Sequence, residues 1–129
     1  MQKECVMMPG AFNGLVGRAV AAHGFEATYI SGAALTGSSG VPDIGLLGME
    51  HFCKAISDVY MASKLPIIAD ADTCFGEGEM CAKTVWEYNK HGAAGLHLED
   101  QVFPKRCGHL DGKTLISIED MMKKVQICA

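Results

Sequence analysis

The sequence has few arginines and a small excess of negative charge. Arg18 and Arg106 are the only arginines, and 11 lysines and arginines face 15 aspartates and glutamates, for a formal net charge of −4. Proteins that bind nucleic acids need clustered Lys and Arg side chains to neutralise phosphates. The composition therefore argues against a nucleic-acid partner.

Long apolar runs are also missing. No run approaches the roughly 18 residues of a membrane span. The first ten residues, MQKECVMMPG, are too short and too polar before Pro9 for a signal peptide. We expect no membrane partner and a cytoplasmic location, or a mitochondrial one if a leader precedes Met1. With 49% hydrophobic and 20% charged residues, the 129 residues suit one packed domain or a piece of a larger one.

The cysteines do not have the spacing of a zinc site or of a disulfide framework. The chain has six, at positions 5, 53, 74, 81, 107 and 128, and none of them forms a CxxC pair. Four of the six lie in apolar or helical segments. We therefore favour reduced cysteines in an intracellular protein over a secreted disulfide scaffold.

Short apolar runs alternate with amphipathic segments along the chain. The expected strands are residues 5–8, 27–30, 65–69 and 93–98. The expected helices are residues 12–23, 49–60, 80–88 and 117–125, with Gly24 and Gly92 at helix ends and Ser117 as a cap. Polar loops are expected at 31–48, 70–79 and 99–115.

This alternation predicts a parallel sheet covered by helices. An open doubly wound sheet and part of a (β/α)8 barrel both fit it. No GxGxxG motif follows the first expected strand, which weakens a dinucleotide-binding fold. Polar loops follow the other strands, where barrel enzymes place their chemistry, and a whole barrel needs about 250 residues. We therefore expect an α/β chain of four βα units, with residues 1–129 forming the N-terminal half of one barrel catalytic domain.

Acidic residues follow two expected neighbouring strands. Asp70 and Asp72 end the third strand and share one side of an extended chain, and Glu99 and Asp100 end the fourth. Such carboxylates form an oxygen-rich site suited to Mg²⁺, with Mn²⁺ as an alternative. Solvated loop acids that cap helices are the alternative, and Glu99 at the matching position of the next strand favours the metal site.

Two further segments are candidates for binding or chemistry. Ser31-Gly32 follows the second strand, where a glycine can expose backbone N–H groups to an anion, although an ordinary turn would have the same sequence. In Lys105-Arg106-Cys107-Gly108-His109, neighbouring positive charge favours a thiolate, so Cys107 could act as a nucleophile or as an acid and base. A basic surface loop with an incidental cysteine is the alternative.

These segments together resemble the isocitrate lyase/phosphoenolpyruvate mutase superfamily. The similar segments are PGAFNGL, YISGA, VPDIGLL, LPIIADADTCFGE and GLHLEDQVFPKRCGH, which occur in the expected order over nearly the whole chain. The KRCGH loop is the most specific of them. It resembles the carbon–carbon lyases of the superfamily, namely 2-methylisocitrate lyase, 2,3-dimethylmalate lyase and the related oxaloacetate hydrolases, more than the phosphonate-forming mutases.

The resemblance implies a (β/α)8 barrel that binds Mg²⁺ and cleaves a 2-hydroxy di- or tricarboxylate, releasing an α-keto acid. It also implies a small-molecule carboxylate as substrate and a homo-oligomer, a tetramer, for the full-length protein. The implied catalytic residues are Cys107 as the general acid, with Lys105, Arg106 and His109 around it. The implied substrate-binding residues are Ser31, Gly32, Ala33, Asp43 and Gly108. The implied metal site has Asp72 as the direct ligand, with Asp70 and Glu99 acting through water.

The sequence departs from this family at two positions and in its length. Ala33 and Cys74 stand where many relatives have glycine, and Cys74 would crowd the site if its backbone needs a positive φ. Four of the eight βα units are missing, so we expect that residues 1–129 alone are not a competent lyase. The alternatives are an oxaloacetate hydrolase or phosphonate-type enzyme of the same fold, a non-catalytic or interaction fragment, and a flavodoxin-like module.

Overall fold

The computed structural model describes residues 5–129 and contains one parallel three-stranded sheet in the order β1-β2-β3. The strands are β1 (Thr28–Ile30), β2 (Ile67–Asp70) and β3 (Gly95–His97). Ile30 pairs with Ala69, and Ala69 pairs with Leu96. The parallel α/β architecture predicted from the sequence is therefore confirmed.

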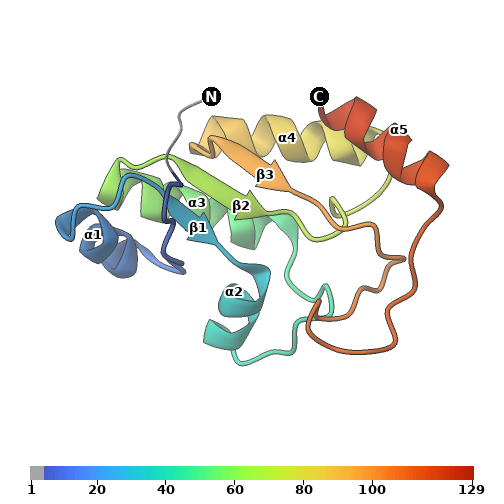
Figure 1. Ribbon diagram of the computed structural model, residues 1–129, viewed down its shortest axis with the longest axis horizontal. Helices are drawn as coiled ribbons and strands as arrows, with labels where there is room; N and C mark the ends of the chain where they lie inside the picture. Colours follow the sequence, from blue (N-terminus) through green and yellow to red (C-terminus); the bar gives the residue numbers. More distant parts are fainter. Residues whose placement is uncertain (1–4) are drawn as a thin grey trace.

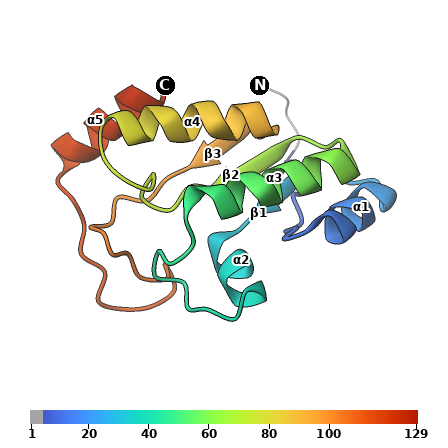
Figure 2. The same ribbon diagram turned by 180° about the vertical axis from the view of Figure 1, so that it is seen from behind.

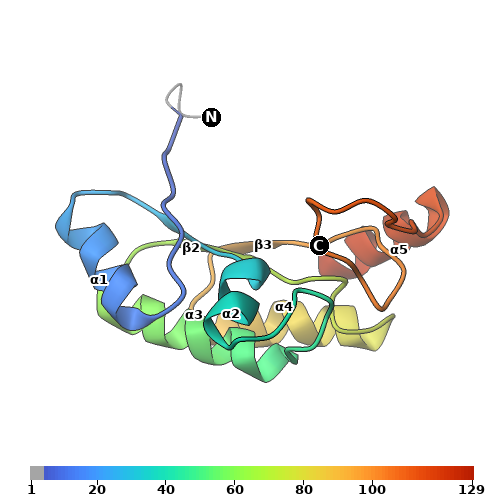
Figure 3. The ribbon, with the colours of Figure 1, turned by 90° about the horizontal axis from the view of Figure 1, so that it is seen from below.

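Helices cover one face of this sheet. The helices of the described chain are α1 (Gly14–Ala22), α2 (Gly32–Ser38), α3 (Met49–Ser63), α4 (Glu79–His91) and α5 (Ile118–Cys128). Figures 1 and 2 show α3 and α4 running along the sheet, and Figure 3 shows α1, α3 and α4 together on the same side of it. None of the helices in residues 5–129 is long and apolar enough to cross a membrane.

The core lies between the sheet and these helices. Strand residues Ile30, Ile67 and Ala69 are fully buried, as are Phe52 and Ile56 of α3. Burying such apolar side chains is the main favourable contribution to folding. On the opposite face of the sheet, side chains such as Ile68 and Tyr29 are only partly buried.

The expected first strand, residues 5–8, does not form. The residues that follow it make one parallel bridge, from Gly10 to Tyr29, with hydrogen bonds from Ala11 N to Tyr29 O and from Tyr29 N to Pro9 O. Continued in the same register, residues 5–8 would face residues 24–27. That segment begins with the turn at the end of α1, where Gly24 has a φ of 79°, so it offers no extended partner.

The expected loop at 31–48 is also partly wrong, because α2 occupies its first part. Ser31 is the N-cap of α2 and accepts a hydrogen bond from Ala34 N at 3.3 Å. A seven-residue helix containing two glycines has too little hydrophobic periodicity to be recognised from sequence. The predicted helix ends at Gly92 and Ser117 are confirmed, since they are the C-cap of α4 and the N-cap of α5.

Strand β3 has no neighbour on its outer side within residues 5–129. An open apolar groove of about 360 Å³ lies there, lined by residues that include Leu96, Leu98, Tyr88 and Val125. Several large apolar side chains of α5 are also exposed, with Ile118 at 77% and Met122 at 56%. This edge of the sheet is therefore left without a covering layer by the described chain.

Candidate active site

The carboxyl ends of the three strands place the candidate residues at one edge of the sheet. Asp70 is the last residue of β2, Glu99 follows β3, and α2 follows β1 directly. Figure 1 shows α2 and the long segment between β3 and α5 at this same end. Parallel strands bring their carboxyl ends together, which is why residues far apart in sequence meet here.

Asp70 is buried and bound to backbone donors. Its Oδ2 accepts a hydrogen bond from Gly32 N at 2.9 Å, and its Oδ1 accepts one from Asp72 N at 2.9 Å. A Cβ added to Gly32 would lie 2.8 Å from Asp70 Oδ2 and 3.2 Å from Asp72 Oδ1. Gly32 is therefore needed for the close approach of α2 to the acids, and Asp70 fixes the geometry of both segments.

Lys105 lies inside the acidic cluster. Its side chain is almost fully buried, and its Nζ is 2.7 Å from Asp43 Oδ1, 2.7 Å from Asp72 Oδ1 and 3.9 Å from Glu99 Oε1. Asp43 Oδ1 and Asp72 Oδ1 are both buried, and the Lys105 ammonium forms an ion pair with each of them within hydrogen-bonding distance. The structure thus brings together Asp43, Asp70, Asp72 and Glu99, with one ammonium group among them.

Burial and charge shift the protonation equilibria of this cluster. Burial raises the pKa of Asp72 to about 6, the nearby Asp70 and Asp43 carboxylates add to the rise, and Lys105 opposes it. Burial alone would lower the pKa of Lys105. The contacts with Asp43 and Asp72 outweigh that effect and raise the Lys105 pKa above its usual value. Lys105 is therefore a permanent cation at the centre of the cluster.

Gln101 organises the segment that carries the candidate catalytic residues. This buried side chain donates a hydrogen bond from Nε2 to Glu99 Oε2 at 2.6 Å and another to Arg106 O at 2.8 Å. Its Oε1 accepts a hydrogen bond from Arg106 N at 3.0 Å. Sequence reasoning missed Gln101, because nothing in its local pattern distinguishes a buried amide from a surface one.

Cys107 follows Arg106, whose backbone Gln101 holds, and lies in a turn. It is not among the residues that contact the Lys105 ammonium. The Cys107 thiol is half-buried and lies 3.9 Å from His109 Nδ1, and Leu110 N donates a hydrogen bond to Cys107 O. The sequence predicted that Lys105 and Arg106 would flank the thiol with positive charge. The structure pairs the Lys105 ammonium with Asp43 and Asp72, which leaves His109 as the ionisable side chain in contact with Cys107.

The remaining predicted substrate-binding residues lie at the same edge. Ser31 caps α2, Ala33 is exposed on its first turn, and Asp43 reaches the cluster from the segment after α2. Gly108 O accepts a hydrogen bond from Lys113 Nζ at 2.9 Å. These contacts define where the four residues lie, and their roles in substrate binding remain predictions.

Tyr29 and His97 form a pair that the sequence did not reveal. Their rings stack with centroids 5.4 Å apart, and Tyr29 Oη lies 2.5 Å from His97 Nε2. Burial, followed by the charges of Asp70 and Glu99, raises the pKa of Tyr29 to about 12. His97 is two residues before Glu99, and residues two apart in a strand point to the same side. This alternation could have placed His97 on the side of Glu99 from the sequence.

The donor atoms of the acidic cluster fit a hard cation. In residues 5–129 no three His, Cys, Asp or Glu side chains are arranged as ligands around one point. The cluster nevertheless offers carboxylate oxygens, two of them buried beside the Lys105 ammonium, and oxygen ligands are those that Mg²⁺ prefers. In this structure the Lys105 ammonium supplies the positive charge that such oxygens require.

The comparisons with known proteins cover the whole chain. Residues 1–129 match the family model described as phosphoenolpyruvate phosphomutase. The chain is 46% identical over 124 residues to 2-methylisocitrate lyase from Aeropyrum pernix. The matched region covers 96% of this chain and 40% of that protein. The chain therefore spans less than half the length of this curated relative.

Solved structures share the fold closely. An oxaloacetate acetylhydrolase bound to the inhibitor 3,3-difluorooxalacetate superposes with a TM-score of 0.94 and 35% identity over 98% of this chain and 44% of that one. A phosphonopyruvate hydrolase in complex with oxalate and Mg²⁺ has a TM-score of 0.86 and 29% identity over 97% and 42% of the two chains.

Proposed function

The chain belongs to the phosphoenolpyruvate phosphomutase family, whose (β/α)8 barrel it forms in part, and from this premise we propose that its parent protein is a carbon–carbon lyase. The proposed substrate is a 2-hydroxy di- or tricarboxylate like 2-methylisocitrate or 2,3-dimethylmalate. The proposed products are an α-keto acid and a second carboxylate. The observation that carries the proposal is the acidic cluster beside the Cys107 loop, in a chain 46% identical to a 2-methylisocitrate lyase.

Magnesium is the proposed cofactor. Asp72, whose buried Oδ1 is paired with the Lys105 ammonium in this structure, would be the direct ligand, and Asp70 and Glu99 would act through water. When bound, the ion would supply positive charge to an α-keto acid oxygen on which negative charge develops. The Mg²⁺ complex of the phosphonopyruvate hydrolase supports this assignment.

The side chains of this chain have distinct roles in the proposed reaction. The substrate hydroxyl loses its proton, a carbonyl forms, and the carbon–carbon bond breaks. Cys107 donates a proton to the departing carbon, with His109 in contact with its thiol at 3.9 Å. The first turn of α2, with Ser31, Gly32 and Ala33, holds the α-keto acid portion, and Lys105 and Arg106 balance the charge of the bound carboxylates.

The test is a lyase assay on the full-length protein with Mg²⁺ and 2-methylisocitrate or 2,3-dimethylmalate. We expect keto-acid release, and we expect Cys107→Ser to lower kcat by about 10²–10⁴-fold, the usual contribution of general acid catalysis. Cys5→Ser is the matched control, because Cys5 is exposed and far from the cluster in sequence. Unchanged turnover in Cys107→Ser would remove the thiol from the mechanism.

A chain of residues 1–129 alone is expected to lack this turnover. The uncovered groove beside β3 and the exposed side chains of α5 indicate that further structure completes the barrel. Activity of this segment comparable to the full-length protein would contradict that expectation.

Oxaloacetate hydrolysis is a second candidate activity. Its support is the 35% sequence identity to the oxaloacetate acetylhydrolase. An assay with oxaloacetate as the substrate separates the two, because oxaloacetate hydrolysis consumes water and yields oxalate and acetate, whereas the lyase reaction consumes no water.

A further inference from the structure

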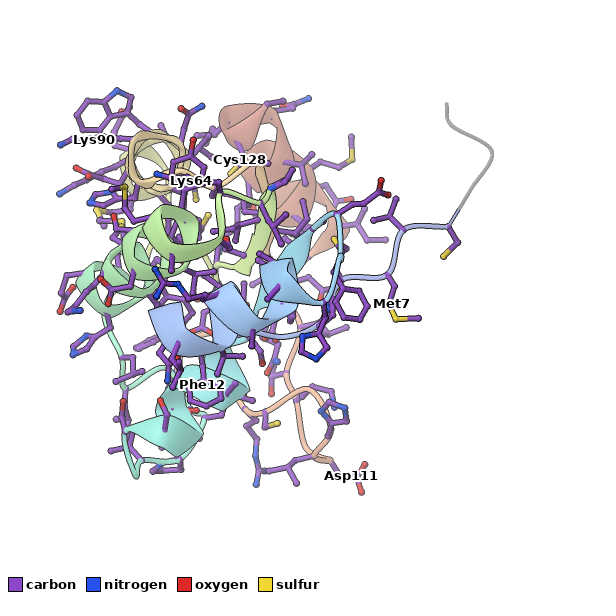
Figure 4. The ribbon with its side chains drawn as sticks, turned by 90° about the vertical axis from the view of Figure 1, so that its left-hand side faces the viewer. Met7, Phe12, Lys64, Lys90, Asp111 and Cys128 are labelled. Atoms are coloured by element: carbon purple, nitrogen blue, oxygen red, sulfur yellow. The ribbon has the colours of Figure 1, made fainter. Side chains whose placement is uncertain are left out.

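Two thiols outside the acidic cluster lie next to each other. Cys74 Sγ is 3.8 Å from Cys128 Sγ, although the two residues are 54 positions apart. Cys74 lies in the loop after β2 and Cys128 is the last residue of α5, and both are free cysteines in this structure. Figure 4 labels Cys128 where α5 lies against α4.

Separate contacts hold each of the two segments in place. In the loop, Cys74 N donates a hydrogen bond to Ala71 O at 2.7 Å, and Thr84 Oγ1 donates one to Cys74 O at 3.0 Å. On α5, the buried Lys124 donates a hydrogen bond from Nζ to Thr73 O at 3.2 Å and pairs with Glu77 at 2.8 Å. Lys124 therefore fastens α5 to the same loop one residue from Cys74, so the proximity of the thiols is part of the packing.

We propose that Cys74 and Cys128 are a redox modification site, which a hydroperoxide converts into a reversible disulfide. Burial assigns different roles to the two thiols. Cys74 has no exposed surface, so we assign the first oxidation to Cys128 and the second step, attack on the first product, to Cys74. An accessible thiol beside a second thiol is the usual arrangement of reversible cysteine oxidation.

The chemistry balances with one hydroperoxide per disulfide. The Cys128 thiol releases its proton, the thiolate attacks one peroxide oxygen, and the O–O bond breaks. With hydrogen peroxide, the leaving hydroxide takes up the released proton, so the products are Cys128 sulfenic acid and water. The Cys74 sulfur then attacks the Cys128 sulfur, the S–S bond forms, the S–O bond breaks, and a second water leaves with the proton of Cys74. The peroxide gains two electrons and the two thiols lose them.

The disulfide would link α5 to the loop that carries the acidic cluster. Cys74 is two residues after Asp72, and its φ of 71° is in the left-handed region that disfavours side chains. The sequence analysis expected Cys74 to crowd the site if its φ were positive. The Cys74 side chain instead points to Cys128, away from the acids. A bond here would restrict the movement of Asp72 relative to α5.

The test treats the full natural chain with hydrogen peroxide and maps the products by mass spectrometry. We expect a loss of about 2 Da, one linked peptide pair containing Cys74 and Cys128, and recovery of both thiols with dithiothreitol. Cys5→Ser is the matched control and should form the same link. A link between Cys74 and the buried Cys81, or no link at all, would overturn the proposal.

Single variants test the assigned order. In Cys74→Ala, a sulfenic-acid reagent should label Cys128, because the resolving thiol is gone. In Cys128→Ser, a variant at a partly exposed position, Cys74 should stay unmodified at the same peroxide concentration. Labelling of Cys74 in Cys128→Ser would show that the order is wrong, and circular dichroism of each variant establishes that it is folded.

Discussion

Lys105 and Asp72 form a buried ion pair in which Nζ lies 2.7 Å from Oδ1. Asp43 shares the same ammonium group at 2.7 Å. Two carboxylates from different loops thus share one ammonium group, which comes from a third segment, after β3. The pair therefore does two things: it makes a cluster of acids stable without a metal ion, and it holds three loops at one edge of the sheet.

Replacing Lys105 with methionine is expected to destabilise the protein strongly. The variant keeps a long apolar side chain but leaves Asp43 and Asp72 buried without a cation, which costs about 3–5 kcal/mol for a broken buried pair. Urea unfolding measures the change. Lys54→Met is the matched control, because the exposed Lys54–Asp58 pair contributes only about 0.3–0.5 kcal/mol. Equal losses in both variants would contradict the importance of burial.

The stability of the protein without metal should depend on the ionisation of Asp72. Its pKa is about 6 in the folded protein, against 3.8 for an unperturbed Asp. Between these values the folded state binds more protons than the unfolded state, so this group lowers stability as pH rises from about 4 to 6. The loss of stability between pH 4 and 6 is about 2 kcal/mol.

Urea unfolding of the wild type and Asp72→Asn across this pH range tests the sign. The wild type should lose stability relative to Asp72→Asn as pH rises. Asp120→Asn is the control, because hydrogen bonds from Lys123 and Ser117 lower the pKa of Asp120, so this group is ionised in both states and should add little pH dependence in this range. The same trend in both variants would disprove the role of Asp72 burial.

Gly32→Ala is expected to separate α2 from the acidic cluster. The new Cβ would lie 2.8 Å from Asp70 Oδ2, so the Asp70 side chain or the helix must move, at a cost of about 1–3 kcal/mol. Gly37→Ala in the same helix is the control, because a Cβ there meets nothing within 4 Å. We expect Gly37→Ala to stabilise the protein by about 0.4–1 kcal/mol, as measured by thermal unfolding.

Gln101→Leu should loosen the Cys107 segment. Leucine has a similar size but cannot bond the N–H and C=O of Arg106 or the Glu99 carboxylate, and an unsatisfied buried group costs about 1–3 kcal/mol. Limited proteolysis should cleave residues 102–113 faster in this variant. Gln126→Leu, on the exposed surface of α5, should leave the cleavage rate unchanged.

Much of the secondary structure could be predicted because its causes are local. The hydrophobic periodicity of α3 and the capping by Ser117 and Gly92 depend on residues within a few positions of one another. The prediction of a strand at residues 5–8 was wrong because a strand needs an extended partner to pair with, and the turn at Gly24 does not provide one. The failure at α2 has another cause: short helices depend on their surroundings more than on their own pattern.

The sequence by itself determined the alternation of strands and helices, the acids at the carboxyl ends of β2 and β3, and the KRCGH motif. Only the tertiary structure decided that Lys105 pairs with Asp43 and Asp72, that Gln101 binds both Glu99 and Arg106, and that Cys74 meets Cys128. The physical reason is distance along the chain. Residue types and local periodicity are written in neighbouring positions, but ion pairs, buried amides and thiol contacts form between segments that only the packing of the sheet brings together.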